Sequence, residues 1–242
     1  MGDKDTTLDE HSALSRDLLK DIEAFIDEIG ERGCTTHLES VTTNGKYLKG
    51  SKLGQLPERF VEDHLIFPVL QTLGHSVQPR PVQYAPKWNY GRGIPDFALT
   101  TITPDTAKEH GVRLFGEAKP PNKLGYAKED VQEYLQKDLD FHAVVILTDG
   151  IKWELWLRPR NEPLELDEDG EYEADATASL RDALGQVKGR NLQKHSYHPH
   201  HTRGKLDEEA FSDFTASVIQ NIIQSEFEIE VDYGERSSAG DY

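Results

Sequence analysis

The stretch that decides the fold lies between residues 93 and 119. It reads Gly-Ile-Pro-Asp-Phe-Ala-Leu over residues 93–99 and Val-Arg-Leu-Phe-Gly-Glu-Ala-Lys over residues 112–119, with a long polar connection between the two runs. Both runs have the composition and length of strands. Successive strand residues point to opposite faces, so Glu117 and Lys119 are expected on one face. If the two runs pair as a hairpin, Asp96 lies near Glu117.

The residues at the ends of these runs suggest a particular chemistry. Two carboxylates and a backbone carbonyl suit Mg²⁺, which prefers oxygen ligands and keeps water or phosphate oxygens as its others. Such a metal lowers the pKa of bound water and offsets charge on a reacting phosphate. A nearby ammonium orients the water or stabilises the developing anion. Asp96, Glu117 and Lys119 therefore outline a site for phosphodiester hydrolysis.

The pair Pro95-Asp96 followed by Glu117-Ala118-Lys119 resembles the signature of the PD-(D/E)XK nucleases. Over about residues 57–158 the chain is most similar to the N-terminal nuclease domain of type I restriction enzyme R subunits. The resemblance implies an α/β, restriction-endonuclease-like fold, with a mixed central sheet flanked by helices and extra helices at both termini. It also implies a DNA endonuclease of restriction or defence that depends on Mg²⁺, with Mn²⁺ as a substitute.

The resemblance also implies roles for individual residues. Asp96 and Glu117 would bind the metal with the Ala118 carbonyl, and Lys119 would position or activate water. A glutamate on the first helix of the family often leans toward the metal, and a glutamine on a later helix assists. Here the matching residues are Glu58, with Glu62 as the alternate, and Gln132, with Gln136 one turn later as the alternate.

Glu58 and Glu62 also attract attention without any resemblance. Both fall inside the apolar stripe of the helix expected over residues 57–74. A carboxylate on a buried face is costly unless it is paired or bound to a metal. The alternatives are a salt bridge to Arg80 or Arg92 and an exposed first turn.

The charge of the chain is strongly negative. Its 242 residues carry a net charge of −17, whereas nucleic-acid binding relies on Lys and Arg. Either the partner is not nucleic acid, or the many acidic residues form a halophilic surface that keeps the protein soluble in concentrated salt. We favour the halophilic surface. Basic tracts interrupted by aromatics predict nucleic-acid contacts, although loops without such a role have the same composition. The candidates are Lys87, Trp88, Tyr90, Arg92, Lys123 and Lys128.

The chain divides into an N-terminal extension (1–56), a nuclease-like core (57–160) and a C-terminal part (161–242). Periodicity predicts helices over residues 7–29, 57–74, 127–140 and 207–227, with a short one over 174–185. Strands are expected at 75–83, 142–147 and 151–157 besides the central hairpin, giving four or five in all. Residues 151–157 read as an edge strand with one of Trp153 and Trp156 in the core. Residues 34–56 read as a loop or ribbon, 158–173 as a polar spacer and 228–242 as an acidic tail.

Other classes of function have less support. Cys34 is the only cysteine, which excludes an intrachain disulfide and a cysteine metal cluster. No apolar run has the length to cross a bilayer, and no secretion signal is recognised, so we expect a cytoplasmic protein. No phosphate-binding Gly-rich loop supports ATP use. The histidines between His195 and His201 suit either a metal or a basic loop near nucleic acid, and we favour the loop.

The expected partner is DNA, duplex rather than single-stranded, and a homodimer follows if both strands are cut. A further partner subunit is open. The rival hypothesis from another class is a catalytically silent nuclease-like module that binds nucleic acid or a protein. The intact trio of Asp96, Glu117 and Lys119 argues against it. A third hypothesis, an enzyme acting on a non-nucleic phosphate, requires a closed small-molecule pocket.

Overall fold

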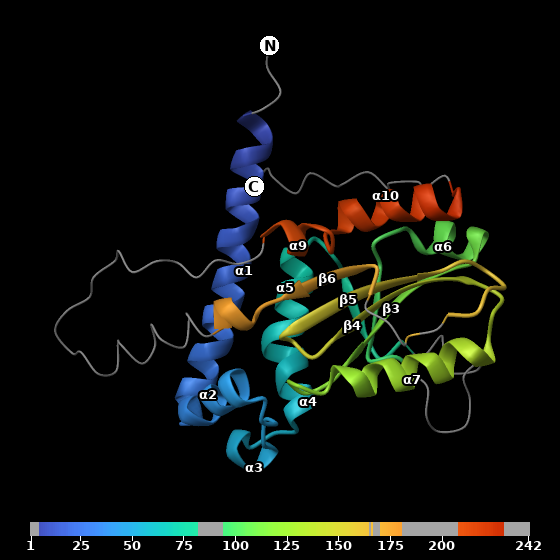
Figure 1. The fold of residues 1–242 in the computed structure, drawn as a ribbon. Coiled ribbons are helices and arrows are strands. Elements are labelled where there is room, and N and C mark those ends of the chain that lie inside the picture. Colours follow the sequence, from blue (N-terminus) through green and yellow to red (C-terminus); the bar gives the residue numbers. More distant parts are fainter. Residues whose placement is uncertain (1–4, 82–93, 165, 167–169, 181–207, 230–242) are drawn as a thin grey trace.

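We analysed a computed structural model of the chain, which describes residues 5–81, 94–164, 166, 170–180 and 208–229 (Figure 1). The N-terminal half contains α1 (Asp5–Glu31), α2 (Thr35–Asn44), α3 (Gly50–Leu53), α4 (Pro57–Val61), the π-helical turn η1 (Glu62–Ile66), α5 (Phe67–Thr72), β1 (Val77–Pro79) and β2 (Phe97–Leu99). The remainder contains α6 (Pro104–His110), β3 (Val112–Ala118), α7 (Leu124–Lys137), β4 (His142–Thr148), β5 (Lys152–Arg158), β6 (Tyr172–Asp175), α9 (Glu208–Ser212) and α10 (Ala216–Phe227).

The strands of the described residues form one mixed sheet in the order β1-β2-β3-β4-β5-β6. Only β3 and β4 run parallel, and α7 provides the crossover between them. The predicted hairpin is confirmed, because β2 and β3 pair antiparallel with Phe97 opposite Gly116. Six strands replace the four or five expected. The mixed α/β class is confirmed.

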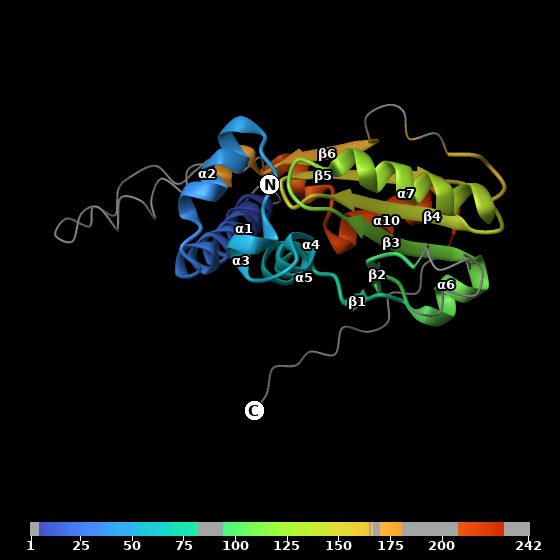
Figure 2. The same cartoon turned by 90° about the horizontal axis from the view of Figure 1, so that it is seen from below.

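Helices cover both faces of this sheet (Figures 1 and 2). On one face, α7 closes a cluster that includes Phe115, Val131 and Trp156. The other face carries a larger cluster shared with α1, α4, α5, α9 and α10. Trp153 belongs to this second cluster, so the expectation that one of the two tryptophans lies at a rim is wrong: Trp153 and Trp156 are both buried, on opposite faces.

The helix predicted over residues 57–74 is confirmed, but it is not regular. Its middle turn, η1, is π-helical, and the Phe67 N–H donates to the Glu62 carbonyl five residues earlier. Pro68 follows directly in α5 and has no N–H to donate. The turn before Pro68 is thus π-helical, a feature that is often found at functional sites.

The described N-terminal part is mostly helical, with short non-helical links between α1, α2 and α3. As predicted, α1 places Leu18, Ile22 and Phe25 in the core, and burial of each such side chain contributes about 1.5–3 kcal/mol. The expectation of a loop or ribbon over residues 34–56 is wrong, because α2 and α3 form there. Leu38 and Val41 of α2 are buried, and this single apolar turn was too short to stand out among threonines, whose helix propensity is low.

The long polar connection between β2 and β3 contains α6, whose N-cap Thr103 accepts from the Thr106 N–H. Three further expectations need correction. β5 is not an edge strand, because β6 pairs with it in the segment read as a polar spacer. The C-terminal helix is divided into α9 and α10, since Thr215 caps a new helix by accepting from the Val218 N–H. The first strand, expected over residues 75–83, covers only Val77–Pro79 among the described residues.

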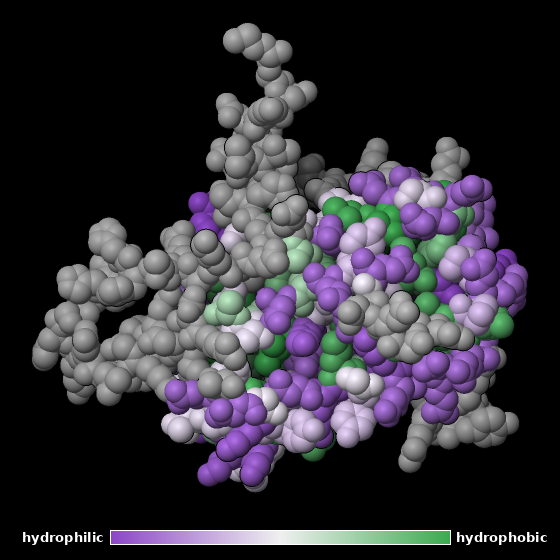
Figure 3. All heavy atoms as spheres, in the orientation of Figure 1, coloured by the Kyte–Doolittle hydropathy of each residue, from purple (hydrophilic) through white to green (hydrophobic). Residues whose placement is uncertain are grey.

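The described surface seen in Figure 3 is largely hydrophilic, with smaller hydrophobic areas between the polar ones. Within the part of the chain that the structure describes, no helix combines the length and apolar character needed to cross a membrane. Residues 82–93, the histidines at 195–201 and most of the acidic tail lie outside the described residues.

Candidate metal centre and its lysine

Three carboxylates meet where β2 begins and α4 passes into η1. Glu58, Glu62 and Asp96 each direct one oxygen into a group whose atoms all lie within 4.8 Å of one another. Glu62 is fully buried and Asp96 nearly so, whereas Glu58 is partly exposed. Like charges this close repel strongly in a poorly solvated site. The arrangement therefore favours the binding of a cation.

Helical spacing and two arginines set the position of Glu62. Glu58 and Glu62 are four residues apart and so share one face of the helix. The Arg59 guanidinium donates to Glu62 Oε2 at 2.6 Å, and Arg80 lies 3.6 Å from Oε1 and 3.7 Å from Asp96 Oδ1. Oε1 is nevertheless buried and accepts no hydrogen bond from the described residues. One oxygen of a buried carboxylate thus remains available to a ligand.

The sheet itself fixes Asp96. Its Oδ2 accepts a 2.9 Å hydrogen bond from the Ala118 N–H at the end of β3. The N–H and C=O of one strand residue point to the same side, so the Ala118 carbonyl also faces this edge. Gly116 makes the close approach of β2 possible, because a Cβ there would lie 2.1 Å from Phe97 Cζ and 2.5 Å from the Ile146 carbonyl.

Glu117 and Lys119 form a second part of the site, on the sheet face covered by α7. Lys119 Nζ lies 2.7 Å from Glu117 Oε1 and 2.8 Å from Asp130 Oδ2. The predicted shared face of Glu117 and Lys119 is therefore confirmed. Glu117 is not a member of the three-carboxylate group. It is buried, and the negative charge of Asp96 contributes to its raised pKa.

Burial and mutual repulsion raise the pKa of the glutamates. Burial is the larger cause and the negative charge of Asp96 the second for Glu58, Glu62 and Glu117, and the pKa of Glu117 is raised well above its ordinary value. For Lys119 burial lowers the pKa, but the charge of Glu117 and the hydrogen bonds to Asp130 and Glu117 outweigh it, so the pKa is raised. Lys119 is consequently a permanent cation at neutral pH.

A tight turn holds the chain that leaves the site. The Lys119 N–H donates to the Thr148 carbonyl at 2.9 Å. Asp149 then accepts from the backbone N–H groups of Asn122, Ile151 and Lys152. The turn at residues 148–150 therefore also fixes the end of β3.

The described donors fit a hard divalent cation. Three carboxylates supply oxygen ligands of the kind that Mg²⁺ and Mn²⁺ take, and Glu62 Oε1 has no hydrogen-bond donor of its own. The residues that would hold the ion are Glu58, Glu62 and Asp96. The sequence prediction named two of these three as ligands and gave the third as an alternate.

Other predicted residues lie differently. Asp130 is the α7 residue that contacts Lys119, and Gln132 lies about 200° away around the helix axis. Lys128 lies 3.0 Å from the buried carboxylate of Glu154 and over the Trp156 ring, so its ammonium already has a partner. The predicted nucleic-acid contacts Lys87, Trp88, Tyr90 and Arg92 lie outside the described residues.

Sequence reasoning missed Asp130 and Gly116. Asp130 flanks the buried stripe of α7 with its side chain 47% exposed, so no local signal sets it apart from other surface acids. Gly116 offers a weak signal, since glycine inside a strand often marks a close backbone or side-chain approach.

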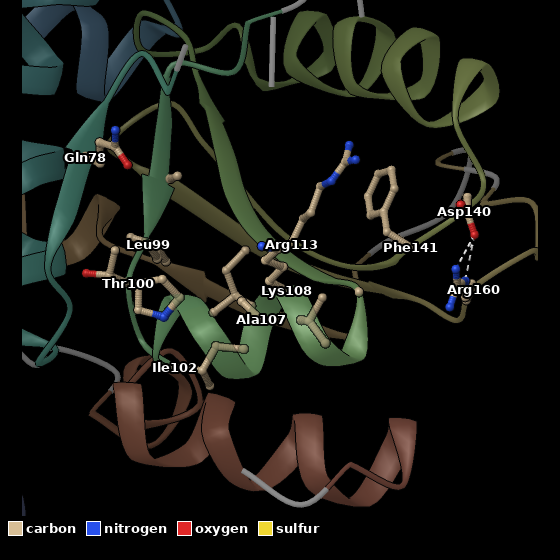
Figure 4. Close-up of a pocket in the computed structure, with 15 residues that line it drawn as sticks. Gln78, Leu99, Thr100, Ile102, Ala107, Lys108, Arg113, Asp140, Phe141 and Arg160 are labelled. Atoms are coloured by element: carbon tan, nitrogen blue, oxygen red, sulfur yellow. Dashed lines mark hydrogen bonds and ion pairs between the residues drawn. The ribbon is translucent and has the colours of Figure 1, made fainter. Parts of the chain in front are cut away.

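A cavity of about 580 Å³ lies at the opposite end of β3 (Figure 4). Its lining includes Arg113, Phe141 and Arg160, and Arg160 pairs with Asp140. Glu58, Glu62, Asp96 and Glu117 do not line it. This cavity therefore does not provide the closed pocket that an enzyme acting on a small phosphate compound would need beside the acidic group.

Fold and site together define a mixed α/β protein with a buried acidic group and a paired lysine at one end of a six-stranded sheet. Comparison with family models, curated proteins and solved structures finds no match to this chain. Its function must therefore be argued from the site.

Proposed function

We propose that this chain is a metal-dependent endonuclease that hydrolyses phosphodiester bonds of DNA. The observation that carries the proposal is the convergence of Glu58, Glu62 and Asp96 within 4.8 Å, beside a lysine held by two further carboxylates. A structural salt bridge alone would not require three carboxylates to share one point. The resemblance to PD-(D/E)XK nucleases at Asp96, Glu117 and Lys119 agrees with this chemistry.

A bound Mg²⁺ or Mn²⁺ would supply Lewis-acid activation of the phosphate and of a water molecule. Around it, the Ala118 N–H orients Asp96 through the hydrogen bond to Oδ2. Lys119 stays protonated between Glu117 and Asp130, so its role is to stabilise the anionic phosphate and position water rather than to remove a proton. Arg80, which is 45% exposed beside Asp96 and Glu62, is placed to meet substrate phosphate oxygens.

The decisive test is cleavage of supercoiled plasmid and of single-stranded DNA with Mg²⁺ or Mn²⁺, at low and at molar KCl, with a chelator control. Asp96→Asn keeps the shape of the side chain and removes its charge, and we expect a loss of at least about 100-fold. Asp63→Asn is the matched control, because Asp63 is an exposed acid in η1, next to Glu62, and accepts from Gln55 outside the acidic group. Its cleavage rate should equal that of the wild type.

The rival hypothesis, a catalytically silent module, makes a different forecast. Metal binding by the wild type without cutting under any salt condition would favour it. Equal cleavage by the wild type and Asp96→Asn would contradict the assignment of the site, and absence of metal binding would refute the nuclease proposal.

A further inference from the structure

Two exposed tyrosines flank a lysine next to the acidic site. Lys123 Nζ lies 4.7 Å from the ring centre of Tyr47 and 5.7 Å from that of Tyr126. About half of each tyrosine is exposed, 51% for Tyr47 and 53% for Tyr126. We call these three residues the tyrosine–lysine patch. Large aromatic side chains that remain exposed around a cation are typical of binding surfaces rather than of packing.

The patch is attached firmly to the site. Asn122 lies three residues after Lys119 and has a left-handed backbone with φ of 67°. Its N–H donates to Asp149 Oδ2, and its side-chain amide donates to the Val41 and Lys46 carbonyls. These bonds hold the segment that carries Tyr47 against the turn that leaves β3. The position of the patch relative to Lys119 is therefore fixed by the fold.

Positive charge gathers around the patch although the whole chain is acidic. Lys46, Lys49 and Lys52 are exposed. All three lie near His37, whose pKa is lowered first by burial and then by the charges of these lysines. Lys46 directly precedes Tyr47, and the Asn122 amide contacts the Lys46 carbonyl, so these lysines and Lys123 belong to neighbouring segments. In a chain of net charge −17, such a group of lysines is suited to an anionic ligand.

The combination fits an unpaired nucleic-acid strand. Bases stack on exposed aromatic rings while lysines contact the phosphates, and the bases of a duplex cannot do so because they are paired and stacked inside it. We propose that the tyrosine–lysine patch binds a single-stranded stretch next to the phosphodiester to be cut, so that the preferred substrate contains unpaired nucleotides. The role of the patch in cleavage rests on the proposed nuclease function, whereas its binding of an unpaired strand can be tested without that function.

The test is fluorescence anisotropy with a labelled oligothymidylate of about 20 nucleotides, in the presence of EDTA so that no cleavage occurs. Wild type is compared with Tyr47→Leu and Tyr126→Leu, which remove a ring, and with Tyr47→Phe and Tyr126→Phe, which keep it. Lys20→Ala is a charge control, because Lys20 is exposed on α1 and pairs with Asp17. A duplex and an abasic strand of equal length serve as competitors.

We expect each leucine variant to bind roughly 5- to 150-fold more weakly, the range for loss of one base–aromatic stack, while the phenylalanine variants and Lys20→Ala bind as the wild type does. The abasic strand and the duplex should compete poorly. The proposal would be overturned if the affinity of the leucine variants for the strand lay within about twofold of that of the wild type. Equal competition by the abasic strand, or a preference for duplex, would also overturn it. Unchanged circular dichroism of the variants excludes loss of folding.

The two proposals fail separately. If the protein cleaves DNA in a metal-dependent way but its strand affinity does not depend on either tyrosine, the proposed role of the patch is refuted. The proposed nuclease function is then unaffected. Tyrosine-dependent strand binding without cleavage supports the patch and points to the silent nucleic-acid-binding module. Binding of an acidic polypeptide such as polyglutamate in place of the strand, with the same dependence on the tyrosines, would overturn nucleic acid as the ligand.

Discussion

Replacement of His75 should remove a large part of the sensitivity of this fold to mild acid. His75 is buried between the sheet and the segment that leads into α10. Its Nε2 lies 2.7 Å from the Phe214 carbonyl and its Nδ1 lies 2.8 Å from Thr101 Oγ1. A carbonyl only accepts, so Nε2 carries the proton and Nδ1 accepts from the Thr101 hydroxyl. Neutral imidazole satisfies both bonds, and a second proton would break one of them.

The size of the effect follows from the pKa. Burial lowers the pKa of His75 from 6.5 to about 4, although the bond to Phe214 acts in the opposite direction. The unfolded chain therefore takes up the proton first as the pH falls, and stability present above pH 6.5 is lost between there and about pH 4. Linkage gives a loss of about 2 kcal/mol between pH 7.5 and 5, and about 3.4 kcal/mol at the acid limit.

The assay is urea unfolding followed by circular dichroism, at pH 7.5 and 5.0 and at one fixed salt concentration, for wild type and His75→Gln. The buried glutamates also titrate, and protonation of groups with a raised pKa acts in the opposite direction, but both proteins contain them. The difference between the two pH dependences isolates His75. We expect the wild type to lose about 2 kcal/mol more than the variant. Equal losses in the two proteins would refute the reasoning.

Three other changes test the site. Gly116→Ala should cost about 1–3 kcal/mol or more and lower the unfolding midpoint, since the new Cβ would lie 2.1 Å from Phe97 and 2.5 Å from a backbone oxygen; an unchanged midpoint would contradict the described approach of β2. Glu62→Gln should weaken Mn²⁺ binding in calorimetry by about tenfold or more, and wild-type binding should weaken as the pH falls, because protons compete for glutamates with raised pKa. Asp130→Asn should lower kcat more than KM, because Lys119 Nζ loses the charged hydrogen-bond acceptor at 2.8 Å that helps to hold it in place; an unchanged kcat would show that Asp130 does not position the lysine.

The central part of the fold was accessible from the sequence because its signals are strong and local. β4 is a continuous apolar run and β5 follows after an Asp-Gly turn, so both strands were predicted nearly to their ends. The pairing that brings Asp96 toward Glu117 followed from alternation and from the positions of the two runs. Glu58 and Glu62 stood out because a carboxylate on an apolar stripe is costly unless it is paired or bound to a metal.

The rest depended on tertiary contacts that no local pattern displays. β6 contains one buried residue, Ala174, and forms because β5 offers it a hydrogen-bonding edge. The break before α10 depends on the Thr215 cap and on the bond from the Ala216 N–H to the Leu73 carbonyl. Asp130 could not be connected with Lys119 before the packing of α7 on β3 was known.

The π turn also makes the acidic group unusually sensitive to chain length. A π turn is equivalent to one residue added to an α-helix. Deletion of a single residue from η1 would restore regular winding and rotate the preceding turn by about 100°. Glu58 would then move away from Asp96, Arg59 would move away from Glu62, and Phe60 would leave its place in the core. We therefore expect related chains that keep this acidic group to keep the number of residues between Glu58 and Pro68 unchanged, even where the side chains between them vary.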